Sequence, residues 1–123
     1  MKDQFTKASS SFQKAISHQL ALMLANPIFN ATPKRVAILK YFVNQTLAGK
    51  GRDIKDDMVA VEVFGRGQDF DQTVDPIVKI QTDILRRAVV RYYETTGKND
   101  PIRIDIPKGT YVPVLKKRKL KEP

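Results

Sequence analysis

The longest amphipathic pattern in the chain lies at residues 75–94, which read DPIVKIQTDILRRAVVRYYE. Asp75 can cap a helix, and Pro76 suits its first position because the missing N–H would have no partner there. Apolar residues then recur at three- and four-residue steps, as in a helix with one buried face: Ile77, Ile80, Ile84, Leu85, Ala88, Val89 and Tyr92. We therefore expect a helix of about five turns whose other face carries Lys and Arg.

A second helical pattern runs from Ser10 or Ser11 to Ala25. The serine run offers a cap, and the Asn26–Pro27 step ends the helix because proline disfavours helical geometry in the residue before it. The apolar stripe of this helix consists of Phe12, Ile16, Leu20 and Met23 or Leu24. This stripe can pack on the rest of the domain or against the same helix of a second copy.

Two more helices are expected between these patterns. Thr32 and Pro33 open a helix that runs to Gly49, with a buried side formed by Val36, Leu39, Tyr41, Phe42, Val43 and Leu47. Residues 50–53 then form a turn, and residues 54–55 can form a very short strand. Asp56 or Asp57 caps a short helix over MVAVEVFG, although the β-branched residues of this segment would also suit a strand.

Near the C-terminus the pattern changes from a helical to an alternating period. Residues 102–106, IRIDI, alternate as a strand with one buried face does. Residues 107–110 form a tight turn in which Gly109 can take a positive φ angle. Residues 111–115 return as an edge strand, the position in which Pro113 is tolerated. We expect a β-hairpin with Lys108 at its tip and Arg103 on its exposed face.

The order helix, short helix, loop, long basic helix and hairpin is that of a winged helix-turn-helix. The predicted fold is therefore mainly α with a small β-hairpin, a winged helix-turn-helix with an additional N-terminal helix. The expected division of the chain is a flexible N-terminus over residues 1–9, one domain over residues 10–115 and a basic tail over residues 116–123.

Charge changes this picture in favour of nucleic acid. The chain has 22 Lys and Arg against 13 Asp and Glu, a formal charge of +9. Five of the basic residues and one acidic residue lie at 116–123, so the rest of the chain still carries +5. Such a field favours polyanions, because binding to a phosphate backbone releases condensed counterions.

Composition excludes several classes of function. The chain has no cysteine, and His18 is its only histidine. No residues suited to acid–base, nucleophilic or metal chemistry therefore come together in the pattern, so we expect no enzyme, no cofactor, no metal site and no small-molecule ligand. There is also no apolar run of membrane-spanning length and no signal peptide. We expect a cytoplasmic, nucleoid-associated protein without membrane contact.

Two segments also resemble a known family. The runs VDPIVKIQTDILRRAVVRYYETTG and IRIDIPKGTYVPVL resemble the effector domain of OmpR/PhoB-type response regulators. More closely, VEVFGRGQDFD, DPIV and IRIDIPKGTYVPV resemble a winged-helix-like domain at the N-terminus of bacterial cyclase and tetratricopeptide proteins. The likeness covers about residues 34–115. It departs at the start, where a helix replaces the small sheet of OmpR-type domains, and at Asp83 and Ile84, where the relatives are rich in arginine.

The resemblance implies a reading helix at residues 75–94 and a wing at residues 102–115. The implied DNA-binding residues are Lys79, Gln81, Thr82, Asp83, Arg86, Arg87, Arg91, Arg103 and Lys108. Gln81 would pair with adenine, Arg86 with guanine and Asp83 with cytosine N4, while Thr82 would contact a methyl group or a phosphate. Lys79 would belong to the same groove-facing surface, whereas four further cations would bind phosphates: Arg87, Arg91, Arg103 and Lys108. Alternatively, each charge is solvated or forms a salt bridge with Asp75, Glu94 or Asp105.

These inferences lead to two functional hypotheses. The first is a transcriptional regulator that binds double-stranded DNA sequence-specifically as a homodimer or higher oligomer, with residues 10–25 as one candidate contact between copies. The second is a protein-docking module built on the same scaffold without DNA binding.

Overall fold

The computed structural model of the chain describes residues 9–118, and these residues are mainly helical. The helices are α1 (Ser10–Leu24), α2 (Pro27–Asn30), α3 (Pro33–Leu47), the 3-10 turn η1 (Gly51–Asp53), α4 (Asp56–Phe64) and α5 (Ile77–Glu94). Strands β1 (Ile102–Asp105) and β2 (Val114–Lys117) pair antiparallel, with Ile104 opposite Leu115. The expected class, mainly helical with a small β-hairpin, is confirmed.

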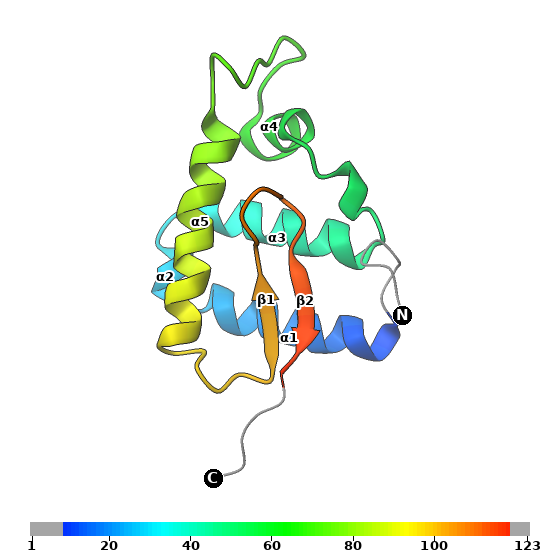
Figure 1. The fold of residues 1–123 in the computed structure, drawn as a ribbon, viewed down its shortest axis with the longest axis vertical. Coiled ribbons are helices and arrows are strands. Elements are labelled where there is room, and N and C mark those ends of the chain that lie inside the picture. The colour runs from blue at the N-terminus through cyan, green and yellow to red at the C-terminus, as the bar shows by residue number, and fades with distance from the viewer. Residues whose placement is uncertain (1–8, 119–123) are drawn as a thin grey trace.

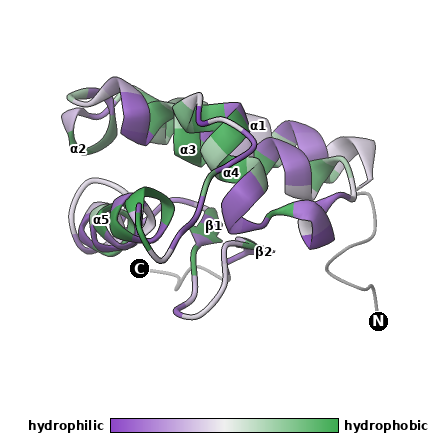
Figure 2. Ribbon diagram, turned by 90° about the horizontal axis from the view of Figure 1, so that it is seen from above, coloured by the Kyte–Doolittle hydropathy of each residue, from purple (hydrophilic) through white to green (hydrophobic). Residues whose placement is uncertain are grey.

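The elements form two layers around one hydrophobic core. The hairpin lies beside α5 (Figure 1), and the view from above places α1, α2 and α3 together on the far side of this pair (Figure 2). Large side chains from both layers are fully buried between them: Phe29, Phe42, Leu85, Tyr92 and Ile104. The layer formed by α5 and the hairpin therefore has one side against the core and one side open to solvent.

The N-terminal helix α1 belongs to this core. Ser9 caps it, with Oγ accepting a hydrogen bond from the Phe12 amide at 3.4 Å. Ile16, Leu20 and Met23 are buried against α3 and β1. The apolar stripe of this helix thus packs within its own chain, the first of the two alternatives considered for it.

The segments on either side of α3 hold one unexpected element and one wrong expectation. Between α1 and α3, Asn26 caps the short helix α2 by accepting a hydrogen bond from the Ile28 amide at 2.9 Å, and no sequence pattern predicted this helix. Residues 54–55 form no strand: η1 precedes them, and Ile54 is buried as an isolated extended residue. The segment from Asp56 is a helix as expected, and it ends at Gly65 with a φ of 65°.

Helix α5 begins later and faces a different way than expected. Asp75 does not cap it but accepts a hydrogen bond from Arg66 Nε at 2.8 Å. The buried side consists of Val78, Thr82, Leu85, Ala88, Val89, Tyr92 and Tyr93. Ile80, expected in the core, is 51% exposed. The core selects the stripe through Val78, Leu85 and Tyr92 because that stripe carries no charge, whereas Ile80 shares its side of the helix with Arg87 and Arg91.

The second strand is shifted toward the C-terminus. It starts at Val114, just after Pro113, which has no N–H to donate to the sheet. It also includes Lys116 and Lys117, which we had assigned to a tail. Arg118 is fixed as well, since its guanidinium donates to the carbonyl groups of Gly97, Lys98 and Asp100. The proposed boundary at residue 116 is therefore wrong; the remaining tail residues, and the expected flexible N-terminus up to residue 8, lie outside the described residues.

Candidate nucleic-acid interface

The solvent-facing side of α5 carries three exposed cations and two exposed apolar residues. Successive helical residues are rotated by about 100°, so the side opposite the core consists of one strip: Lys79, Ile80, Asp83, Arg87, Val90, Arg91 and, at the last residue of the helix, the exposed Glu94. We call this strip the outward face of α5. Three of the expected DNA-binding cations, Lys79, Arg87 and Arg91, therefore lie where a ligand can reach them.

Two of the proposed base-reading residues do not belong to this face. Thr82 is only 1% exposed, and its hydroxyl has no hydrogen-bond partner among the described residues. Its assignment to a groove-facing surface is wrong, because the core takes the stripe on which it lies. Gln81 is half-buried and points to the flank of the helix nearer the core, so the predicted contact with adenine does not fit its position.

Arg86 has a structural role that the sequence did not reveal. Its Nε donates to the Ile106 carbonyl at 2.8 Å, and Nη2 donates to the Thr110 carbonyl at 3.2 Å. Nη1 donates to the Asp83 carboxylate. The side chain is 15% exposed, and a contact with guanine would require these bonds to break. Arg86 therefore fixes the hairpin loop to α5, while Asp83 keeps its second oxygen free of Arg86.

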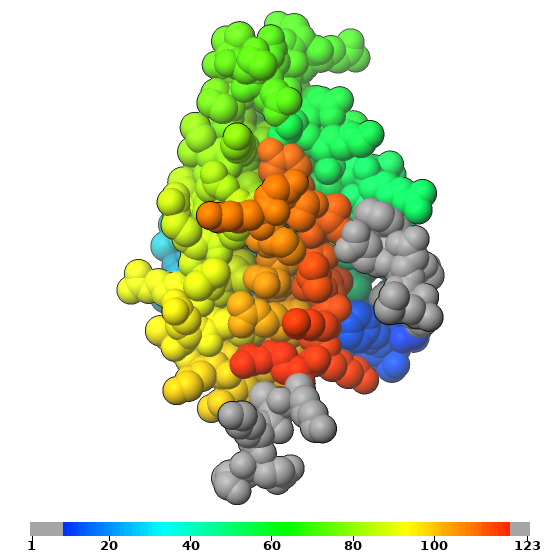
Figure 3. Space-filling view, in the orientation of Figure 1, coloured from blue at the N-terminus to red at the C-terminus, as the bar shows by residue number. Residues whose placement is uncertain are grey.

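The hairpin places further positive charge next to α5. The exposed Lys108 lies in the loop between the strands, followed by Gly109 with a φ of 83°. Arg103 and Lys116 are opposite one another across the strands, so their side chains leave the same face. Arg103 is held more tightly than expected, because its guanidinium stacks on the Tyr93 ring at 4.6 Å. The surfaces of α5 and the hairpin adjoin on one side of the molecule (Figure 3).

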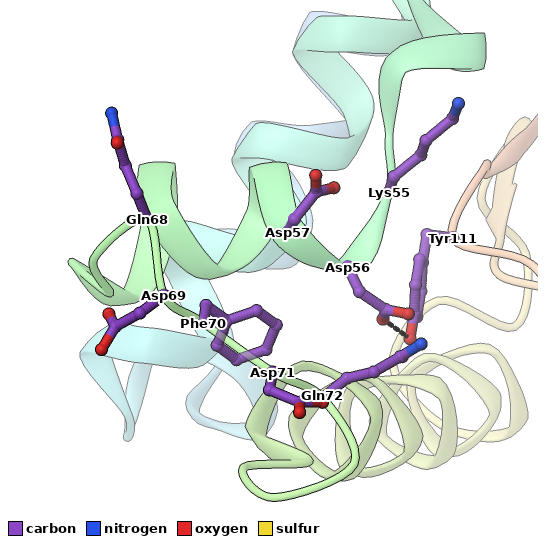
Figure 4. Close-up of a pocket in the computed structure, with 9 residues that line it drawn as sticks. All are labelled: Lys55, Asp56, Asp57, Gln68, Asp69, Phe70, Asp71, Gln72 and Tyr111. Atoms are coloured by element: carbon purple, nitrogen blue, oxygen red, sulfur yellow. Dashed lines mark hydrogen bonds between the residues drawn. The ribbon is translucent and has the colours of Figure 1, made fainter.

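Tyr111 anchors the hairpin loop to the other layer. Its ring stacks on Phe42 with 6.0 Å between the ring centroids, and its hydroxyl donates a hydrogen bond to the Asp56 carboxylate at the start of α4 (Figure 4). Burial raises the pKa of Tyr111, and the negative charge of Asp56 raises it further. The loop is thus held from two sides, by Arg86 on α5 and by Asp56 on α4.

A buried polar network fixes the opposite end of the hairpin. Tyr93 Oη donates to the Ile102 carbonyl at 2.9 Å and accepts from the Ile104 amide at 2.8 Å. The Asp100 carboxylate accepts from Tyr92 Oη and, at 2.9 Å, from Gln19 Nε2 of α1. These bonds set the position of β1 relative to α5. They therefore also set the distance between the cations on the outward face of α5 and the cations of the hairpin.

An acidic hollow of about 790 Å³ lies beside this surface (Figure 4). Its carboxylates come from the start of α4 and from the loop before α5: Asp56, Asp57, Asp69 and Asp71. Within residues 9–118, no group of three His, Cys, Asp or Glu side chains is arranged to hold a metal ion. The hollow repels phosphate and therefore limits where a polyanion can lie.

Sequence reasoning missed Ile80 as a surface residue and Lys116 as a strand residue. Ile80 precedes Arg87 by seven positions and Arg91 by eleven, a spacing that puts all three on one side of a helix. That spacing was the available signal. Lys116 had no comparable signal, because the pairing register depends on the loop conformation.

Among the described residues no helix has both the length and the apolarity needed to cross a membrane. No protein-family description, no curated protein and no solved structure matches this chain.

Proposed function

We propose that this protein is a sequence-specific transcriptional regulator of the winged helix-turn-helix kind, which binds double-stranded DNA. In this proposal α5 lies in the major groove, whose width of about 12 Å accepts one helix, and its N-terminal turns meet the base edges. The hairpin acts as the wing and contacts the backbone or the adjacent minor groove. Such a regulator would be located in the cytoplasm, at the nucleoid.

One observation carries this proposal: the outward face of α5 adjoins the hairpin loop that carries the exposed Lys108, because Lys79 and Asp83 line one hollow together with Gly109 and Thr110 of that loop. A duplex lying on this surface would meet Lys79, Arg87 and Arg91 from the helix and Lys108 from the loop. The acidic hollow borders the same region and would exclude phosphates from its side. Contacts of this kind favour a particular position of the duplex, and base contacts from α5 would add sequence preference.

The test is the salt dependence of binding to a random-sequence duplex, measured by fluorescence anisotropy. Several phosphate contacts predict a linear fall of log affinity with log salt, with a slope of about −0.9 per contact. Arg87→Ala with Arg91→Ala should lose most of the affinity. Lys14→Ala with Lys40→Ala removes the same charge from the exposed surface of α1 and α3 and is the matched control.

The alternative, a protein-docking module, makes the opposite prediction for the same titration. Such a module would have little affinity for duplex at any salt concentration. Weak binding that both double variants reduce equally would also contradict the proposed interface, because it would reflect net charge alone.

The proposed regulator acts as a homodimer or higher oligomer on DNA. Since the apolar stripe of α1 is buried within its own chain, contact between copies would use other surfaces. Sedimentation velocity with and without duplex tests this assembly, and a complex of one copy per duplex at saturating protein would contradict it.

A further inference from the structure

We propose that Ile80 reads the methyl group of thymine in the major groove, an inference that rests on the proposed DNA binding. Ile80 is 51% exposed on a helix whose other large apolar residues mostly pack into the core. Its neighbours on the outward face are Lys79, then Asp83 one turn further and Arg87 two turns further. The Ile80 side chain, surrounded by charged residues, does not pack in the core and is available to a ligand that binds this face.

Thymine is the ligand whose chemistry fits an aliphatic side chain at this place. Among the base edges in the major groove, only thymine carries a methyl group, and apolar side chains recognise it by contact. Recognition helices present mainly their N-terminal residues to base edges. Ile80 is the fourth residue of α5 and therefore lies in that part of the helix.

The charges around Ile80 favour nucleic acid over a protein partner as the occupant. Lys79 precedes it, and Arg87 and Arg91 follow on the same side of the helix, positioned for phosphates at the edges of a groove. Asp83, one turn after Ile80 on the same face, is paired with Arg86, which offsets its repulsion of phosphate, and Asp56, which lines a hollow with Lys79, accepts a hydrogen bond from Tyr111. The free oxygen of Asp83 can accept a hydrogen bond from a cytosine amino group next to the thymine.

Val90 provides a matched comparison on the same helix. It is also β-branched, it is 44% exposed and it belongs to the outward face, but it lies ten residues after Ile80. At about 1.5 Å of rise per residue, Val90 is roughly 15 Å further along the helix. If the N-terminal turns of α5 enter the groove, Val90 lies near the backbone rather than the bases.

The experiment compares duplexes that differ only in thymine methyl groups. A duplex selected for tight binding from a random pool is prepared with thymine and again with uracil, which pairs identically but lacks the methyl group. The wild-type protein should bind the uracil duplex about fourfold more weakly for each contacted methyl group. Ile80→Ala should bind both duplexes equally, whereas Val90→Ala should keep the wild-type ratio.

Each outcome decides the inference separately from the proposed function. Equal affinity of the wild-type protein for the two duplexes, with tight and salt-dependent binding, would overturn thymine reading and leave DNA binding intact. An Ile80→Ala variant that keeps the wild-type ratio would also overturn it. Absence of duplex binding by the wild-type protein would overturn both. Circular dichroism of each variant confirms that the fold is retained.

Discussion

Arg86 and Ile106 join the long helix to the hairpin: Nε of Arg86 donates to the Ile106 carbonyl at 2.8 Å. We expect Arg86→Ala to lower the free energy of unfolding by about 1.5–3 kcal/mol, because charged hydrogen bonds to main-chain oxygens are lost. Arg86→Lys should not restore this stability, since lysine lacks the planar fork that reaches Ile106 and Thr110 together. Urea denaturation measures both variants.

The neighbouring Arg87 is the control for this substitution. Its side chain is exposed on the outward face, so Arg87→Ala should leave the free energy of unfolding within about 0.5 kcal/mol of the wild type. Equal losses for the two alanine variants would mean that Arg86 does not hold the loop in solution.

Replacing the buried hydroxyl of Thr82 by an apolar group should stabilise the protein. Its hydroxyl is buried without a partner among the described residues, and such a group keeps its desolvation cost. Thr82→Val replaces the hydroxyl by a methyl group of similar shape and should raise the free energy of unfolding by about 1 kcal/mol. Duplex affinity should not change. A loss of DNA binding in a well-folded Thr82→Val protein would restore Thr82 to the interface.

Gly97 is required because any side chain at this position would collide with the Tyr92 ring. A Cβ atom at this position would lie 2.1 Å from Cε2 of Tyr92, and the Tyr92 ring is packed in the core. Gly97→Ala should therefore lower the free energy of unfolding by about 1–3 kcal/mol through overpacking. Thr96→Ala, at the exposed position next to it, should have little effect. Thermal melts followed by circular dichroism compare the two, and a neutral Gly97→Ala would contradict the tight packing.

Alkaline pH should destabilise the protein. Burial raises the pKa of Tyr92, Tyr93 and Tyr111 above the usual value of about 10. Above pH 10 the unfolded chain releases these phenol protons while the folded chain keeps them, so the free energy of unfolding falls as pH rises. Urea denaturation between pH 8 and pH 11 measures this fall. It should be shallower for Tyr111→Phe, and a flat wild-type profile would contradict the burial of these hydroxyl groups.

Lys108 should contribute a contact that is independent of base sequence. Lys108→Ala is expected to weaken binding to all duplexes by a similar factor and to reduce the slope of log affinity against log salt by about 1. Lys40→Ala, which removes an exposed charge from α3, should leave the slope unchanged. If Lys108→Ala changes the preferred sequence, the loop contacts bases rather than phosphates.

Local patterns in the sequence predicted most of the elements. Caps and prolines such as Pro27 and Pro33 lie at helix boundaries, and the alternation at residues 102–106 predicted β1, because these signals act between near neighbours in the chain. The rotation of α5 was missed because two apolar stripes compete on it. The stripe through Leu85 carries no charge, and it packs against α2, α3, α4 and β1.

The sequence predicted which charged residues of the candidate site are exposed, but it did not predict the hydrogen bonds of Arg86. Lys79, Arg87 and Arg91 are exposed as expected. Arg86 looks equivalent to Arg87 in the sequence, yet its partners lie 20 and 24 positions away in a loop whose shape no local pattern describes. Hydrogen bonds between distant segments depend on the assembled fold, and this is why the role of Arg86 emerged only from the structure.

The hydrogen bond between Gln19 and Asp100 spans 81 positions of the chain. Closing so long a loop costs entropy before the bond can contribute, so we expect this contact to form late in folding. During synthesis on a ribosome, Gln19 of α1 can form this hydrogen bond only after Asp100, in the last quarter of the chain, has been made. The helix that precedes the proposed reading unit is therefore completed together with its final strands.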